Sequence, residues 1–156
     1  MARARRLAVT VQDAAGLEGT PSAQRLRAWA RRALGRAAHG ELTLRIVTED
    51  ESAALNSRYR GKRGATNVLS FGAEPPVGRA GDDLLPIGDL AICAAVVQRE
   101  ALEQGKPARA HWAHMVVHGV LHLKGYDHET KAEAATMEAR EREILATLGF
   151  PDPYSG

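Results

Sequence analysis

The chain of 156 residues is poor in cysteine and in aromatic residues. Its single cysteine, Cys93, excludes an intramolecular disulfide framework, and without a Cys-x-x-Cys pair a cysteine-rich zinc finger is excluded as well. No apolar run approaches the roughly 20 residues that a membrane-spanning helix needs. The basic start of the chain also lacks the apolar stretch of a secretory signal. We therefore expect a cytoplasmic protein without a membrane partner.

The remaining composition is that of an ordinary globular protein, with 44% hydrophobic and 26% charged residues. Aromatic residues make up only 4%, so the core must consist mainly of Ala, Val, Leu and Ile. The length fits one compact domain. We find no repeat, low-complexity tract or linker, and we predict a single domain over residues 1–150 followed by a tail at residues 151–156.

The net charge of +2 hides a basic segment at the start of the chain. Residues 1–36 hold eight arginines but only two acidic residues, Asp13 and Glu18. The planar guanidinium group is well suited to phosphate, which favours a nucleic-acid partner. Composition alone, however, favours the simpler interpretation that arginine solvates the surface of an Ala- and Arg-rich protein.

The hydrophobic pattern predicts an α+β domain with one small sheet. Alternating residues predict strands at 6–12, 41–48, 67–72 and 87–93. Helical periodicity, with Thr20 as the first N-cap, predicts helices at 20–39, 48–59, 94–104, 107–124 and 129–148. Residues 73–86 contain three prolines and two glycines and are predicted to form a surface loop.

Five of the six histidines lie between residues 111 and 128, which is the strongest signal in the sequence. His118 and His122 are four residues apart, so on a helix their imidazoles project from the same face. Gly125 can end that helix with a positive φ and turn the chain back, bringing His128 to the pair. Three neutral imidazoles with one open position are typical of a catalytic zinc site.

The other two histidines of this group fit less specific roles. His114 and His111 lie one and two turns earlier on the same predicted face, and an ordinary buried or hydrogen-bonded histidine explains each of them well. His114 also suits the role of a residue that supports a metal ligand. The surrounding helix is apolar almost all round, so we expect it to be central and buried.

The histidine spacing matches that of metzincin-type peptidases, with one departure. The position after the first histidine, where those peptidases carry a glutamate as general base, is Gly119. A peptidase is therefore disfavoured. Asp127 and Glu129 adjoin His128, and we expect them to orient a ligand or cap the last helix rather than replace that base.

Three segments together resemble the YbeY family of bacterial metal-dependent endoribonucleases. The first is His118-Gly-Val-Leu-His-Leu-Lys-Gly-Tyr-Asp-His128, which is close to the H-G-x-L-H-L-x-G-Y-D-H signature of that family. The second comprises Tyr59-Arg60 and the stretch Thr66-Asn-Val-Leu-Ser-Phe71, and the third is the segment Gly88-Asp-Leu-Ala-Ile92. They occur in the family's order and span most of the domain.

The resemblance implies a zincin-like α+β fold, with a small mixed four-stranded sheet packed against about five helices. It implies that His118, His122 and His128 bind one Zn²⁺ ion and that Arg60 is a further catalytic residue. The implied substrate is single-stranded RNA, with roles in maturation of the 3′ end of small-subunit rRNA and in ribosome quality control. Ribosomal particles and small-subunit assembly proteins are the implied partners.

The residues themselves suggest how such a site would act on RNA. Zinc polarises a phosphoryl oxygen or holds a hydroxide, and RNA supplies its own 2′-hydroxyl, so the missing glutamate matters less than for a peptide. An arginine at position 60 can clamp a phosphate, although a solvent-exposed loop arginine is the simpler alternative. We also expect Gly119 to leave room for a phosphodiester.

Three other functions fit parts of the sequence. The chain would be a ribosome-assembly binding factor if its zinc only orders the C-terminal helices. A zinc peptidase is weakened by Gly119, and a metal-independent RNA-binding protein leaves the histidines unexplained. Imidazole also suits nickel, copper and iron.

Overall fold

The computed structural model describes residues 6–73 and 86–155, and the α+β fold predicted from the sequence is confirmed. Its elements follow one another as β1 (Leu7–Asp13), α1 (Ala23–Leu34), β2 (Gly40–Val47), α2 (Glu49–Arg60), β3 (Val68–Gly72), β4 (Pro86–Cys93), α3 (Ala94–Gln104), α4 (Ala108–Leu123) and α5 (Lys131–Thr147). Most of the predicted loop at 73–86 lies outside the described residues.

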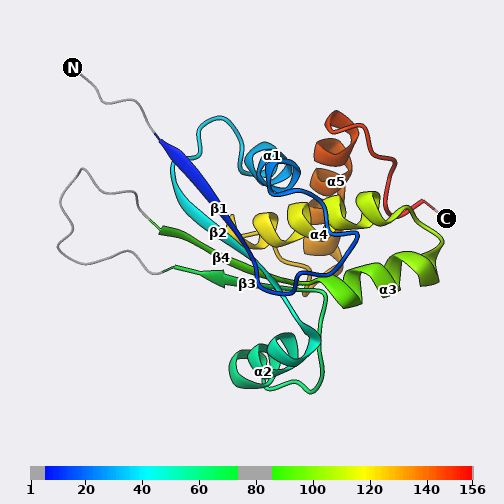
Figure 1. Ribbon diagram of the computed structural model, residues 1–156. Coiled ribbons are helices and arrows are strands. Elements are labelled where there is room, and N and C mark those ends of the chain that lie inside the picture. Colours follow the sequence, from blue (N-terminus) through cyan, green and yellow to red (C-terminus); the bar gives the residue numbers. More distant parts are fainter. Residues whose placement is uncertain (1–5, 74–85, 156) are drawn as a thin grey trace.

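The four strands form one mixed sheet in the order β1-β2-β4-β3. Strands β1, β2 and β4 run parallel, and β3 joins β4 in the antiparallel direction. This arrangement leaves β3 at the edge of the sheet, beside α4 (Figure 1). The edge strand therefore provides a wall next to the helix that carries the histidines.

The two faces of the sheet are covered by different helices (Figure 1). Alternate residues of β2 and β4, such as Leu44 and Leu90, are fully buried in one core with α1, α4 and α5. On the opposite face, Leu69, Ala91 and Cys93 form a smaller core with Leu55 of α2. The period of two in each strand thus places α2 and α4 on opposite sides of the sheet.

Helix α4 is the central helix, as its apolar sequence predicts. Trp112, Val116 and Val120 are completely buried, and Leu121 is as well. Burial on nearly all sides holds the helix between the sheet, α1, α3 and α5. The side chains that project from α4 are consequently fixed in position by the core.

Several predicted helix ends differ from the structure. Helix α1 begins at Ala23, because the Thr20 hydroxyl donates to Leu17 O at 2.7 Å while Ser22 Oγ accepts from Arg25 N at 3.2 Å as the N-cap. Gly35, with φ 92°, ends the helix well before residue 39, so the prediction that it continued to 39 is wrong.

The start of α5 also differs from the prediction. Thr130 is its N-cap, and a capping box joins Thr130 to Glu133. Glu129 therefore does not cap the helix, which corrects one of the two roles expected for that residue.

None of the helices in the described ranges has the length and hydropathy of a membrane span.

Gly119 allows α4 to lie directly against the sheet. A Cβ atom at this position would stand 2.9 Å from Leu90 Cδ2 and 3.1 Å from Val68 Cγ2, both closer than ordinary packing permits. The Ser70 hydroxyl also donates to the Gly119 carbonyl at 3.0 Å. The space beside Gly119 is thus filled by the sheet, and the expectation that it receives a phosphodiester is wrong.

We predict that Gly119→Val destabilises the protein by about 1–3 kcal/mol, because the added methyl groups overpack the contact between α4 and the sheet. Gly72→Val is the matched control, since a Cβ at Gly72 meets none of the described residues within 4 Å. Urea denaturation should show a loss for the first variant and a change within about 0.5 kcal/mol for the second. Equal stabilities of the two variants would contradict this account of the packing.

Candidate metal site

Four histidines form a row along one side of α4. The ring centroids of His111 and His114 are 6.1 Å apart, those of His114 and His118 are 6.2 Å apart, and those of His118 and His122 are 4.8 Å apart. The first two rings are buried, whereas His118 and His122 are partly exposed. The row therefore leads from the core to the surface.

The turn after α4 adds a fifth histidine at the exposed end of this row. Gly125 has φ 102°, a conformation that other residues rarely adopt, and its amide donates to His122 O at 3.0 Å. The turn places the His128 ring 5.6 Å from that of His118 and 5.0 Å from that of His122. Gly125 thus reverses the chain as the sequence predicted.

The rings of His118, His122 and His128 fit a metal ion. One nitrogen from each ring lies within 4.8 Å of the other two. Among the described residues, no hydrogen bond occupies the ring nitrogens of His122 or His128, so these donors are free to bind an ion. Imidazole nitrogen is a good ligand for zinc and for several other transition metals.

The electrostatics of the site favour the neutral form of the central ring. Burial lowers the pKa of His122, and the neighbouring charges of His118 and His128 lower it further. Arg60 acts in the same direction, and Asp127 partly opposes these effects. Because only a neutral imidazole binds a metal ion, the lowered pKa keeps His122 ready to do so.

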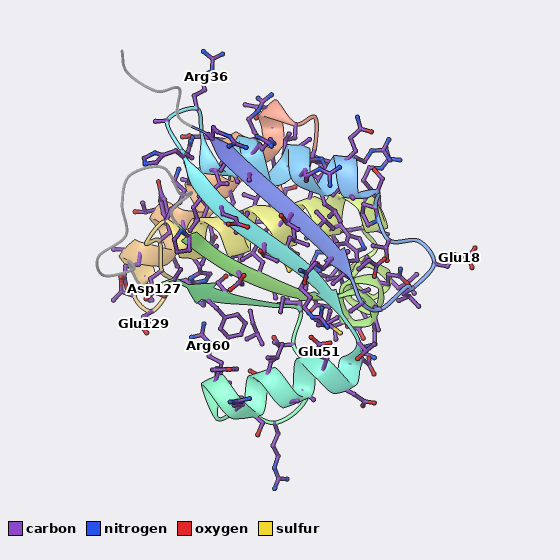
Figure 2. The ribbon with its side chains drawn as sticks, turned by 60° about the vertical axis from the view of Figure 1, so that its left-hand side comes forward. Glu18, Arg36, Glu51, Arg60, Asp127 and Glu129 are labelled. Carbon is purple, nitrogen blue, oxygen red and sulfur yellow. The ribbon has the colours of Figure 1, made fainter. Side chains whose placement is uncertain are left out.

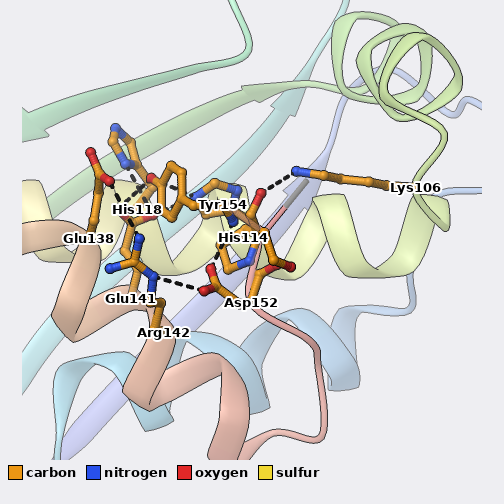
Figure 3. A network of polar contacts seen from close by, with 10 residues as sticks. Lys106, His114, His118, Glu138, Glu141, Arg142, Asp152 and Tyr154 are labelled. Carbon is orange, nitrogen blue, oxygen red and sulfur yellow. Dashed lines mark hydrogen bonds and ion pairs between the residues drawn. The ribbon is translucent and has the colours of Figure 1, made fainter.

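Behind the three rings lies a buried carboxylate that the sequence analysis missed. Glu141 of α5 is completely buried, and its Oε2 atom lies 2.5 Å from His114 Nε2 and 3.4 Å from His118 Nδ1. Tyr154 donates its hydroxyl to Glu141 Oε1 at 2.9 Å (Figure 3). His114, Glu141 and Tyr154 thus form a polar network next to the candidate metal ligands.

The pKa values agree with an ionised carboxylate in this network. Burial opposes ionisation of Glu141, but the contacts with His114 and His118 outweigh it and lower its pKa to about 2. Burial and the neighbouring charge of Glu141 raise the pKa of Tyr154, so its hydroxyl keeps the proton that it donates. Glu141 therefore carries a negative charge in the interior, balanced by polar donors.

The deepest histidine belongs to a separate network. His111 Nε2 lies 2.9 Å from Glu100 of α3, whose carboxylate also accepts from Asn67 Nδ2 at 3.1 Å. His111 is therefore a buried histidine with a hydrogen bond at its Nε2 atom, as the simpler interpretation of its position predicts. His114 instead contacts Glu141 Oε2, the atom that also faces His118, and its role beside a metal ligand stays a prediction.

Arg60 reaches the candidate site from α2. The helix ends at Gly61, which has φ 65°, and Asn56 Nδ2 donates to Gly64 O at 2.9 Å to hold the following turn. Arg60 Nη2 donates to Ser70 O of the edge strand at 3.1 Å. Figure 2 shows Arg60 at the end of α2, on the side where Asp127 and Glu129 lie.

All four candidate site residues border one open cavity of about 920 Å³. Arg60 and β3 form one side, the three histidines form another, and α5 contributes Glu138 and Glu141. Asp127 and Glu129 also line the cavity. Asp127 accepts a hydrogen bond from the His128 amide at 2.8 Å, which fits the expected role of orienting that residue. The structure thus brings together cationic, acidic and imidazole groups around one opening.

Comparisons with known proteins show the family to which the chain belongs. The family model described as endoribonuclease YbeY matches residues 17–149. The chain belongs to this family. It is 56% identical over 151 residues to endoribonuclease YbeY from Halorhodospira halophila, covering 95% of this chain and 96% of the relative. It is 58% identical over 140 residues to the endoribonuclease YbeY of Methylococcus capsulatus, covering 90% and 91% respectively.

A further YbeY relative and a solved structure are also similar to this chain. The endoribonuclease YbeY of Xanthomonas axonopodis pv. citri is 54% identical over 153 residues, covering 97% of this chain and 95% of the relative. The solution structure of TM1509 from Thermotoga maritima has a TM-score of 0.50 and 21% identity, and covers 95% of this chain and 99% of the other. The latter likeness supports the fold of this YbeY-family chain.

We predict that His111 contributes to the pH dependence of folding of this YbeY-family chain. Burial lowers its pKa below the ordinary 6.5, so the folded state resists protonation more than the unfolded state does. Stability is therefore greatest above about pH 6.5 and decreases as the pH falls below that value.

Denaturation of the metal-free protein between about pH 7 and pH 5 measures this contribution. The decrease should be smaller in His111→Gln than in the parent, whereas His39→Gln changes an exposed histidine and should leave the slope unaltered. An identical slope in His111→Gln and the parent would contradict the prediction.

Proposed function

We propose that the chain is a zinc-dependent endoribonuclease that cleaves single-stranded RNA. The observation that carries this proposal is the convergence of His118, His122 and His128 at a cavity that Arg60 also borders. Membership of the endoribonuclease YbeY family supports the reaction class. The three-histidine donor set, with no cysteine among it, supports zinc as the ion.

In this proposal His118, His122 and His128 are the metal ligands. Zinc bound there supplies a Lewis acid for a phosphoryl oxygen or lowers the pKa of a bound water. The lowered pKa of His122 keeps one ligand neutral at neutral pH. His118 and His122 are held by the packed helix α4, whereas His128 is held by the Gly125 turn and by the hydrogen bond from its amide to Asp127.

Arg60 is proposed to bind the scissile phosphate and to stabilise the charge that develops on it. Its guanidinium group is exposed, and one of its nitrogens is bound to Ser70 O, which leaves other donors for a phosphate oxygen. The cavity is wide enough for a nucleotide, since it encloses about 920 Å³. RNA also carries a 2′-hydroxyl group. The nucleophile at this site is therefore either a water molecule or that hydroxyl.

The proposed substrate in the cell is the 3′ end of small-subunit rRNA, with a further role in ribosome quality control. Ribosomal particles and small-subunit assembly proteins in the cytoplasm are the proposed partners. The exposed arginines of α1, among them Arg25, Arg31 and Arg32, support an anionic partner. Among the described residues these three form no ion pair.

The peptidase alternative finds no support at Gly119. The Cβ position there points at Leu90 and Val68, so a glutamate in this place would collide with the sheet. The alternative of a binding factor with an ordering zinc predicts a different result on metal removal. If the ion only ordered α4 and α5, its loss would unfold them, whereas loss from a catalytic site leaves the fold largely intact.

We predict that His122→Ala abolishes cleavage of a single-stranded RNA oligonucleotide and lowers zinc affinity by about 100-fold or more, because one of three ligands is lost. The protein should stay folded, as judged by circular dichroism. The matched control is His39→Ala, which removes an exposed histidine that is not among the residues lining the cavity. Equal cleavage by His122→Ala and the parent would reject the metal site as catalytic.

We predict that Arg60→Ala lowers kcat for the same RNA by about 100-fold, because a charged donor to the reacting phosphate is lost. Zinc affinity should not change, since Arg60 is not a proposed ligand. Arg58→Ala is the control: Arg58 lies in the same helical turn and stacks on Tyr59, but it does not line the cavity. Similar losses in both variants would indicate a general effect of surface charge.

A further inference from the structure

The structure assigns Glu141 and Tyr154 a shared role: Glu141 orients His118 for metal binding, and Tyr154 holds the Glu141 carboxylate in place. Both are positioning residues, since neither belongs to the proposed ligand set. This inference rests on the proposed metal site. Neither Glu141 nor Tyr154 belongs to the three segments that resemble the YbeY family.

The burial of Glu141 requires a reason. The residue is fully buried within α5, on the same side of the helix as the apolar Met137, Ile144 and Leu145. A charged carboxylate in such a position is costly unless polar groups compensate it. Among the described residues, its partners are His114, His118 and Tyr154, and Lys or Arg is not among them. The carboxylate is thus directed at the histidine row and at Tyr154.

Glu141 faces Nδ1 of His118, which is the ring nitrogen that would not bind the metal ion. His118 Nδ1 is buried and has no hydrogen-bond partner among the described residues, and Glu141 Oε2 lies 3.4 Å away. An imidazole that binds a metal through one nitrogen usually donates the N–H of its other nitrogen to a carboxylate, which sets its tautomer and orientation. A proton on Nδ1, facing Glu141, leaves the Nε2 lone pair for the ion.

The two oxygens of Glu141 are held by different groups. Oε2 faces His114 and His118, whereas Oε1 accepts from the Tyr154 hydroxyl at 2.9 Å. Tyr154 also packs its ring against that of His114, with centroids 5.3 Å apart. The carboxylate is thereby prevented from rotating away from His118.

Tyr154 belongs to the segment Asp152–Tyr154, which we call the clasp (Figure 3). Contacts with Arg142 and Lys106 hold this segment in place. Arg142 of α5 lies over the Tyr154 ring at 5.2 Å and donates to Asp152 Oδ2 at 3.0 Å. The Asp152 carboxylate accepts from the Tyr154 amide at 2.8 Å, and Lys106 Nζ donates to the carbonyl of Pro153. Residues assigned to a tail by the sequence prediction thus contact the network behind the metal site.

The test is a metal titration of the full chain and of Glu141→Gln and Tyr154→Phe. Zinc affinity is measured by calorimetry, and Co²⁺ provides a visible absorption spectrum that reports the arrangement of the ligands. Glu141→Gln should lower zinc affinity by about 10- to 100-fold and shift the Co²⁺ bands. Tyr154→Phe removes only a hydroxyl and should lower affinity by about 3- to 10-fold.

Matched controls separate this role from a general loss of stability. Glu143→Gln removes an exposed carboxylate from the same helix, and Tyr59→Phe removes an exposed phenolic hydroxyl that does not line the cavity. Both should bind zinc and Co²⁺ like the parent. If Glu141→Gln does not fold, Tyr154→Phe decides, because it leaves the buried carboxylate and its histidine partners in place.

Three results would overturn the inference. Parental affinity and an unchanged Co²⁺ spectrum in both test variants would show that the network does not act on the metal. A second equivalent of Co²⁺ that is lost in Glu141→Gln would make Glu141 a ligand, together with His114 and His118. A parent chain that binds no metal would reject the proposed function as well, which distinguishes that failure from the other two.

Discussion

The burial of α4 is the constraint on which the rest of the structure depends. A helix enclosed by apolar side chains must still satisfy every imidazole that it carries, because an unpaired buried polar group is costly. Glu100 forms a hydrogen bond with His111, and Glu141 forms one with His114 and faces His118. Toward the surface, where no such partner is present among the described residues, the rings are left to bind an ion. Helix α4 is thereby part of the hydrophobic core and also carries two of the residues of the candidate metal site.

The local part of this arrangement could be predicted from the sequence. The spacing of His118 and His122 follows from the helical period, and Gly125 marked the reversal that brings His128 to them. The four strands and their alternation were also readable, because one face of each strand is apolar. Each of these features depends on residues that are close together in the chain.

The remaining part depends on contacts between distant residues and was not predicted. Glu141 interrupts the apolar stripe of Met137, Ile144 and Leu145, a signal that marks a buried charge but not its partner. Tyr154 appeared to belong to a tail, since nothing nearby in sequence indicates what it contacts. The start of α1 was misplaced because Thr20 and Ser22 are both good N-caps, and the contact of Thr20 with Leu17 decided between them.

The turn at Gly125 has a consequence for the lifetime of the protein. It joins α4 to α5 through a short exposed segment, and His128 is the one proposed ligand on that segment. An ion held there acts as a cross-link between the end of one helix and the start of the next, and any ligand of the folded state shifts local opening by mass action. Resistance of this turn to proteases would then rise with the free concentration of the ion that the three histidines bind.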